Sequence, residues 1–274
     1  AVVWCMGGSQ SIHQEGGQLM PANKEVAEKS SSELAILDPA LFEEDANMGT
    51  VDLGEDDLAL PWLKIVSGQE DGDVNGKKGS IWNTVTGECF DGDEGIKVIS
   101  CAYQRRFIEW APRGSGTGAP VKIYEPGDVM PETVRDENNK DMIVDGDGNY
   151  LEETHQHYVL VLDGETFSPA LIAMKSTQLK KSRKWNSMIV NRTMTNAEGK
   201  TFRPARFSHV YTLTSTQESN SKGNWYGWEI SCDGPIDNAN FYREAKAFNE
   251  QIASGDVNVK HEQDGEVGEN STPF

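Results

Sequence analysis

The stretch that decides the fold is Tyr103–Trp110, which reads YQRRFIEW. Its side chains fall alternately on two faces of an extended chain, and this two-residue period is typical of a half-buried β-strand. One face carries Tyr103, Arg105, Phe107 and Glu109, and the other carries Gln104, Arg106, Ile108 and Trp110. The stretch therefore predicts a strand with one face on a core, and with cationic and aromatic side chains together.

Further strands are predicted on both sides of this stretch, because short apolar runs recur there between turn signals. They are Leu63–Val66, Ser80–Val85, Gly95–Cys101, His155–Leu162, Phe167–Met174, Phe207–Thr214 and Trp225–Cys232. The acidic segment Glu125–Glu153 carries two turn signals and is predicted to form hairpins inserted on the main sheet. The chain is thus expected to be mainly β.

Two helices interrupt the strands. A helix capped by Thr177 is predicted to run to about Val190, with Leu179, Trp185 and Met188 on its inner side. A second helix is indicated near the end of the chain, where Gly255 follows as a stop signal. Its apolar residues repeat with helical spacing at Phe241, Ala245, Phe248 and Ile252. This order predicts an OB-like β-barrel with an inserted helix, a hairpin insertion and a C-terminal helix; a β-sandwich with two helices fits nearly as well.

The bulk composition excludes several classes of protein. The 274 residues carry a formal net charge of -19, which disfavours nucleic-acid binding unless the cations are clustered. No apolar run approaches the roughly 18 residues of a membrane span, and the four cysteines form no CxxC pair. Reduced thiols and a cytoplasmic setting are therefore expected.

No catalytic, metal or cofactor site is predicted. Asp145–Asn149 begins like a calcium loop, but Tyr150 stands where that loop needs glycine. His155 and His157 share a strand face without a third ligand in register, and Gly76–Ser80 lacks the glycine spacing of a phosphate-binding loop. The acidic insertion could suggest a metal-dependent nuclease, but its carboxylates fall in predicted turns. We therefore expect a protein that is not an enzyme.

Cations are concentrated in Lys175–Tyr211, where Glu198 is the only acidic residue. Single-stranded nucleic acid needs cations along its backbone and flat side chains for its unstacked bases. The candidate binding residues in this block are Lys180, Lys181, Arg183, Lys184, Trp185, Arg203, Arg206 and Tyr211. The alternative is a solvated helix face with core aromatics. Because the flanking sequence is acidic, we expect a local positive surface here.

Two smaller sets add candidates for the same site. Arg105, Arg106 and Trp110 combine charge and stacking on the deciding strand, although a sheet with a basic outer face fits as well. Tyr226 and Trp228 share one face of a later strand, while Trp225 falls on the other face. One of these two faces is expected to be core.

The end of the chain completes the pattern. Glu262, Asp264, Glu266 and Glu269 precede Ser271-Thr272-Pro273-Phe274. This acidic tail with a final Phe resembles those of bacterial and T7-type phage single-stranded-DNA-binding proteins, although Ser271 and Thr272 replace acids of the bacterial pattern. Three further stretches also resemble the sequences of DNA-binding proteins of tailed phages. They are Ile81–Glu88, Tyr103–Trp110 and Asn224–Trp228.

The resemblance implies an OB-fold and a role in phage DNA replication or recombination, in the cytoplasm of the infected bacterial host. It implies that Phe274 and the tail bind a phage DNA polymerase or helicase-primase. We expect sequence-independent binding of single-stranded DNA, without membrane contact and with a homodimer left open. The rival prediction is a phage virion or scaffold protein whose basic block is a protein interface.

The expected organisation of the chain has four parts. They are a leader or added segment at 1–19, a flexible acidic arm at 20–59, an OB-like DNA-binding domain at 60–255, and a disordered acidic tail at 256–274.

Overall fold

The computed structural model describes residues 48–50, 58–67, 76–115, 118–221, 223–257, 259 and 261. The predicted leader, most of the predicted arm, and the tail beyond residue 261 with Phe274 lie outside these residues. The chain divides into two compact units, Ala1–Asp52 and Leu53–Phe274, and the elements described below belong to the second unit.

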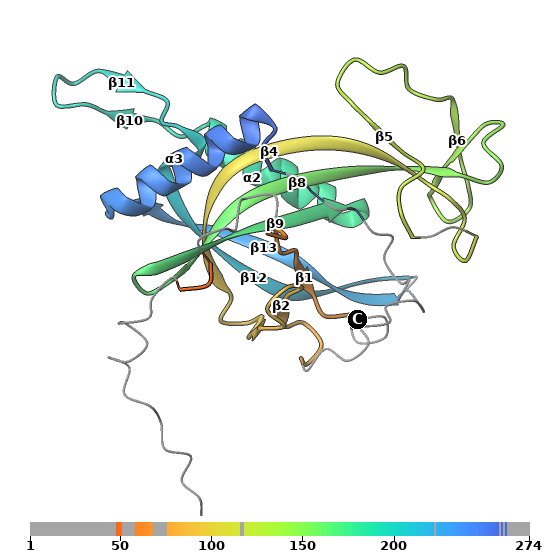
Figure 1. Cartoon of the computed structure of the whole chain (residues 1–274), viewed down its shortest axis with the longest axis horizontal. Helices are drawn as coiled ribbons and strands as arrows, with labels where there is room; N and C mark the ends of the chain where they lie inside the picture. The colour runs from red at the N-terminus through yellow and green to blue at the C-terminus, as the bar shows by residue number, and fades with distance from the viewer. Residues whose placement is uncertain are drawn as a thin grey trace, which may run out of the picture. The chain divides into compact units, whose positions relative to one another are not determined.

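An eight-stranded antiparallel sheet forms the centre of this unit (Figure 1). The long strands β4 and β8 lie side by side in it, and β12 and β13 extend the sheet from β4. The hairpin β6–β7 joins the sheet through β8, which confirms the predicted hairpin on the main sheet. The strands are β4 (Ile96–Trp110), β5 (Lys122–Tyr124), β6 (Thr133–Arg135), β7 (Asp141–Ile143), β8 (Tyr150–Asp163), β9 (Thr166–Lys175), β12 (His209–Asn220) and β13 (Gly223–Pro235).

β4 replaces two predicted strands with one. The sequence predicts separate strands at Gly95–Cys101 and Tyr103–Trp110, but the chain stays extended from Ile96 to Trp110. The pairing of β4 with β8 shifts register between Ser100 and Ala102, which marks a β-bulge. At such a bulge, the alternation of inward-facing and outward-facing side chains shifts by one residue. One continuous strand therefore has a sequence pattern like that of two separate strands.

A smaller three-stranded sheet is formed by β1 (Leu63–Ile65), β2 (Ile81–Asn83) and β3 (Cys89–Phe90). It touches the main sheet at both ends: Trp62 bridges to Leu171 of β9, and the backbone N–H of Ser215 donates to the carbonyl of Gly92. No ring of paired strands closes among the described residues. The fold is mainly β with two helices, and the predicted closed barrel is not found.

The helix α3 (Ala239–Ser254) agrees with its prediction closely. Its buried side chains are the four predicted from helical spacing, and they pack with β4 and β8. The side chain of Asn238 accepts hydrogen bonds from the backbone N–H groups of Asn240 and Phe241 at the start of the helix. Gly255 ends it with φ 89°, a left-handed conformation in which glycine avoids the Cβ clash of other residues.

The helix α2 (Leu179–Val190) begins later than predicted, because a short 3-10 helix, η2 (Ser176–Gln178), precedes it. Gln178 stands at the N-cap position and its side chain makes no capping hydrogen bond, so Thr177 does not cap α2. The buried side chains are Ser182, Trp185 and Ile189, while Leu179 and Met188 are only half-buried.

A two-stranded hairpin that the sequence did not predict follows α2. It consists of β10 (Met194–Thr195) and β11 (Thr201–Phe202), and Figure 1 shows it projecting beyond the main sheet. The side-chain oxygen of Asn196 accepts hydrogen bonds from the backbone N–H groups of Glu198 and Lys200, which stabilises the turn. Such a hairpin cannot be predicted from side-chain periodicity, because its residues are mostly polar and each strand has only two paired positions.

Candidate nucleic-acid interface

The aromatic ring of the basic helix lies in the core. Trp185 has 0% of its surface exposed, and its ring stacks on His157 with centroids 4.5 Å apart and planes 18° from parallel. Its edge meets the ring of Tyr211, which is also buried. Neither Trp185 nor Tyr211 offers a ring face to a nucleic-acid base in this structure, because both side chains are buried.

The other rings predicted to stack are also covered. Trp110 and Trp228 are 3% and 4% exposed. The half-buried ring of Tyr226 lies against Gly79, where an added Cβ would approach a ring carbon to 2.6 Å. Strand alternation explains this, because Tyr226 and Trp228 are on the face of β13 that packs inward. Trp225 is the aromatic residue of this segment on the opposite face.

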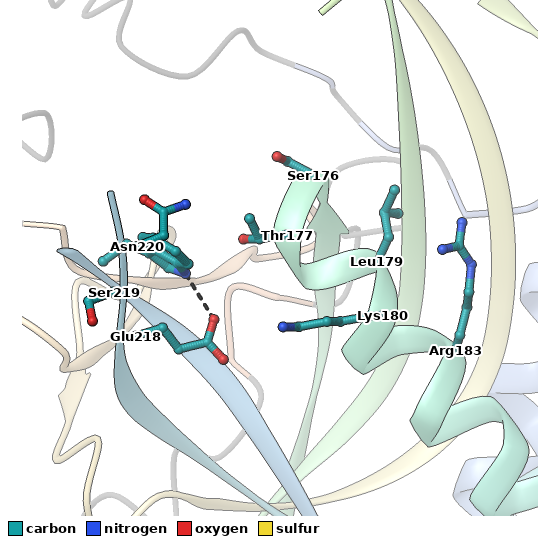
Figure 2. A pocket seen from close by; sticks show the side chains of 9 residues that line it. Ser176, Thr177, Leu179, Lys180, Arg183, Glu218, Ser219 and Asn220 are labelled. Atoms are coloured by element: carbon teal, nitrogen blue, oxygen red, sulfur yellow. Dashed lines mark hydrogen bonds between the residues drawn. The ribbon is translucent and has the colours of Figure 1, made fainter. Parts of the chain in front are cut away.

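Trp225 lines a groove of about 670 Å³ between the turn end of β12 and β13 and the start of α2 (Figure 2). Lys180 and Arg183 line it from α2, and Glu218 and Asn220 line it from β12. Figure 2 shows the Lys180 side chain directed from the helix towards Glu218 on the facing strand. The groove therefore brings together one aromatic ring and two cations.

The one carboxylate of the groove is already engaged. Trp225 Nε1 donates to Glu218 Oε2 at 2.9 Å, and Lys181 Nζ lies 3.0 Å from Glu218 Oε1. Burial favours the protonated form of Glu218, but the hydrogen bonds from Lys181 and Trp225 outweigh it and lower its pKa. The lowered pKa favours the ionised form of Glu218, and Lys180 adds a Coulombic attraction to that charge.

Two lysines of the predicted site form ion pairs within the protein. Lys181 Nζ and Lys184 Nζ each lie 2.8 Å from a carboxylate oxygen of Glu229 on β13. Burial disfavours the charged form of Lys181, but Glu229 and Glu218 outweigh it and raise its pKa. With a side chain only 13% exposed, Lys181 stabilises the packing of α2 on β13.

Glu153 of β8 joins two groups of cations that are far apart in the sequence. Arg105 Nε lies 2.9 Å and Arg183 Nη2 lies 3.4 Å from Glu153 Oε1, and both arginine side chains remain more than half exposed. Arg106 is less available, because it donates to Glu125 and to Gln104, both at 2.8 Å. The structure thus brings Arg105 and Arg183 together and directs Arg106 elsewhere.

The last two predicted cations differ in exposure. Arg206 is largely buried, with Nη1 donating to Ser100 Oγ at 2.9 Å and Nη2 donating to the side-chain oxygen of Asn186. Burial lowers the pKa of Arg206 to about 10. Arg203 is exposed directly after the β10–β11 hairpin, next to Phe202, which is 44% exposed. Only Arg203 of this pair faces solvent.

In the described part of the chain, no group of three His, Cys, Asp or Glu side chains gathers in a way that could hold a metal ion. His155 and His157 do share a strand face, and both side chains are buried. His155 Nδ1 and His157 Nε2 are hydrogen-bonded to the same oxygen, Ser182 Oγ, at 2.7 and 2.8 Å. Asp145 and Asp147 adopt positive φ angles within a turn. Within the described residues, no helix has both the length and the apolarity needed to cross a membrane.

Comparison with known proteins assigns the chain to a family. The model of the Pam3 phage gp34-like proteins matches residues 29–258, which include every strand and helix named above. The searches of curated proteins and of solved structures gave no match. The match covers most of the chain and shows a phage protein. The chain belongs to the Pam3 phage gp34-like protein family.

Proposed function

We propose that the protein binds single-stranded DNA without reading its sequence, in the groove between α2 and the β12–β13 turn. The observation that carries this proposal is the position of Trp225 beside Lys180 and Arg183 in that groove. Phosphates would contact the two cations, and an unstacked base would lie on the indole ring.

The charges around the groove support an anionic ligand. Lys180 and Arg183 line it. Four cations near it share three carboxylates as ion-pair partners: Arg105, Lys181, Arg183 and Lys184, with Glu153, Glu218 and Glu229. Among the described residues, Lys180 is exposed and has no carboxylate within ion-pair distance. An excess of cations remains locally in a chain whose overall charge is -19.

Trp225 is suited to sequence-independent stacking. Its hydrogen bond to Glu218 fixes the indole ring before any ligand arrives, which reduces the entropy lost on binding. Every base has a π-face, so a ring used in this way does not discriminate between bases.

The wider functional proposal follows the sequence resemblance and the phage family. We propose a non-catalytic role in phage DNA replication or recombination, in the cytoplasm of the infected host, with the acidic tail recruiting a polymerase or helicase-primase. An OB-related origin of the fold is part of this proposal, since the small sheet bridges β9 and β12.

The rival proposal is a phage virion or scaffold protein. The pairing of Lys181 and Lys184 with Glu229 favours it, because cations already neutralised within the protein contribute less to binding a polyanion. In that case the groove would receive an acidic segment of another protein.

Fluorescence anisotropy with labelled oligo-dT tests the proposal on the wild type, Trp225→Ala and Tyr242→Ala. Tyr242 is 41% exposed on α3 and lies outside the groove, so its variant is the aromatic control. Loss of affinity in Trp225→Ala alone supports the groove. Equal affinity in all three proteins excludes stacking on Trp225, and no binding at low salt excludes the function.

A further inference from the structure

A second cavity, of about 410 Å³, lies beside β4, between Arg206 at the start of η3 (Arg206–Ser208) and the last turns of α3. Tyr103 and Gln104 line it from β4, and Asn249 and Ile252 line it from α3. The cavity shares no lining residue with the groove of Trp225. It is therefore a separate site.

Arg206 brings a positive charge to this cavity without a counter-ion. Its guanidinium donates to the neutral oxygens of Ser100 and Asn186, and it lies 5.4 Å from the ring centroid of Tyr103. No carboxylate among the described residues lies within ion-pair distance of it. A largely buried charge without a counter-ion is unfavourable, and a bound anion would relieve that cost.

The uncommitted polar atoms of the cavity are mainly donors. A guanidinium has five N–H donors, and hydrogen bonds to Ser100 and Asn186 use two of them. Gln104 Oε1 accepts from Arg106 and from the hydroxyl of Tyr158, which leaves the amide N–H groups of Gln104 as donors. A donor-rich lining without a carboxylate selects a negatively charged ligand.

The edge of β4 beside the cavity adds backbone groups. β4 pairs with β12 at Ile96–Ile99 and with β5 at Phe107–Glu109. Between these two pairings, no described strand occupies that edge; Asn249 Nδ2 donates to the carbonyl of Cys101 there. Along this edge the backbone of Ala102–Arg106 is therefore not paired with any described strand.

We propose that this cavity binds the phosphate group of a nucleotide. Arg206 and the amide of Gln104 hold the phosphate, because planar N–H donors match its oxygens. The volume exceeds that of a phosphate alone, and Ala102, Ile252 and Ala253 form an apolar wall for the sugar or base. The nucleotide is either free or one unit of a nucleic-acid strand.

Isothermal titration with inorganic phosphate, dTMP and thymidine tests this site on the full chain. Ala253 and Ala247 are both exposed on α3, but only Ala253 lines the cavity, so Ala253→Phe places a bulky ring at it. Ala247→Phe is thus the matched control. We expect phosphate and dTMP to bind the wild type and the control, and to lose at least about tenfold in affinity in Ala253→Phe.

Three results would overturn the proposal: no binding of phosphate or dTMP at millimolar concentration, equal dTMP binding by Ala253→Phe, or thymidine binding as tightly as dTMP. Arg206→Gln gives a second check, since it removes the charge and keeps hydrogen-bond donors. It should lose dTMP binding while circular dichroism shows a folded protein, and unchanged dTMP affinity in this variant would also contradict the proposal.

The source of the phosphate is identified by competition in Trp225→Ala, which lacks the proposed stacking residue of the groove. Displacement of dTMP by oligo-dT in this variant assigns the site to a strand, and no displacement assigns it to free nucleotides. Either result leaves the cavity occupied by a nucleotide phosphate. Binding of dTMP therefore tests the cavity independently of whether the groove binds DNA.

Discussion

Trp185 stacks on His157 with ring centroids 4.5 Å apart, so the aromatic residue at the middle of the basic helix is part of the core. The same helix turns Lys180 and Arg183 towards the groove. One helix thus contributes to stability through one face and to the proposed ligand site through another. Trp185, which was predicted to bind DNA, and Trp225, which was not, should therefore differ in their mutant phenotypes.

Trp185→Ala should lower the free energy of unfolding by about 3–5 kcal/mol, because it leaves a large cavity in the core. Trp225→Ala should leave the melting temperature nearly unchanged and weaken oligo-dT binding by about 1–3 kcal/mol. Urea unfolding and fluorescence anisotropy on the same samples separate the two effects. A stable Trp185→Ala protein with weakened DNA binding would contradict this assignment.

Neutralising the cations should distinguish ligand contacts from structural ion pairs. Lys180→Gln and Arg183→Gln should each reduce the salt slope of oligo-dT binding by about 0.7 if each contacts one phosphate. Lys181→Gln should instead lower the melting temperature, because Glu218 and Glu229 lose their shared partner. An unchanged slope in both groove variants would remove these two cations from the site.

The buried histidines predict that stability falls in mild acid. Burial lowers the pKa values of His155 and His157 below their ordinary value. The unfolded chain, with histidine pKa values of about 6.5, then binds protons that the folded protein does not, so unfolding becomes easier as pH falls below that value. His157, whose pKa is lowered well below its ordinary value, should contribute a loss of up to about 1.4 kcal/mol between pH 7.5 and 5.5, and His155, which the Glu153 carboxylate partly stabilises in its charged form, should contribute less.

Urea unfolding at the two pH values measures this loss, and NMR can follow the His157 ring in the folded state. Protonation of His157 near pH 6.5 without loss of structure would contradict the burial argument. The carboxylates of Glu218 and Glu229, whose pKa values are lowered, add a further loss of stability only at lower pH.

A substitution of Gly255 tests whether α3 ends in a left-handed conformation at this residue. Because it adopts φ 89°, Gly255→Ala should destabilise the protein by about 1 kcal/mol. Thermal unfolding monitored by circular dichroism gives the shift in melting temperature. An unchanged or raised melting temperature would show that the helix ends differently in solution.

The strands and helices could largely be predicted, because their side-chain periodicity follows from which face is buried. The clearest case is α3, where Phe241, Ala245, Phe248 and Ile252 mark the buried face without any tertiary information. The prediction of two strands in place of β4 was wrong, because the bulge at Ser100–Ala102 interrupts the side-chain alternation without ending the strand. Closure of a barrel depends on long-range pairing, which periodicity does not report.

The site was harder to predict from the sequence. Composition located the basic block, but it could not show that Lys181 and Lys184 pair with Glu229, which lies in a distant strand. Alternation correctly placed Trp225 opposite Tyr226 and Trp228, yet it could not tell which face was core. Helical spacing correctly placed Trp185 on the inner side of its helix, but the stacking of its ring on His157, another pairing distant in sequence, could not be predicted.

Salt-dependent binding of oligo-dT and duplex DNA of equal length tests the central claim most directly. If some four phosphates are neutralised, the log–log slope for oligo-dT against salt should be about -3, at ~0.7 per phosphate. Binding to the single strand should exceed binding to the duplex at every salt concentration. Equal affinity for duplex, or no binding to oligo-dT at low salt, would contradict a single-stranded-DNA-binding function.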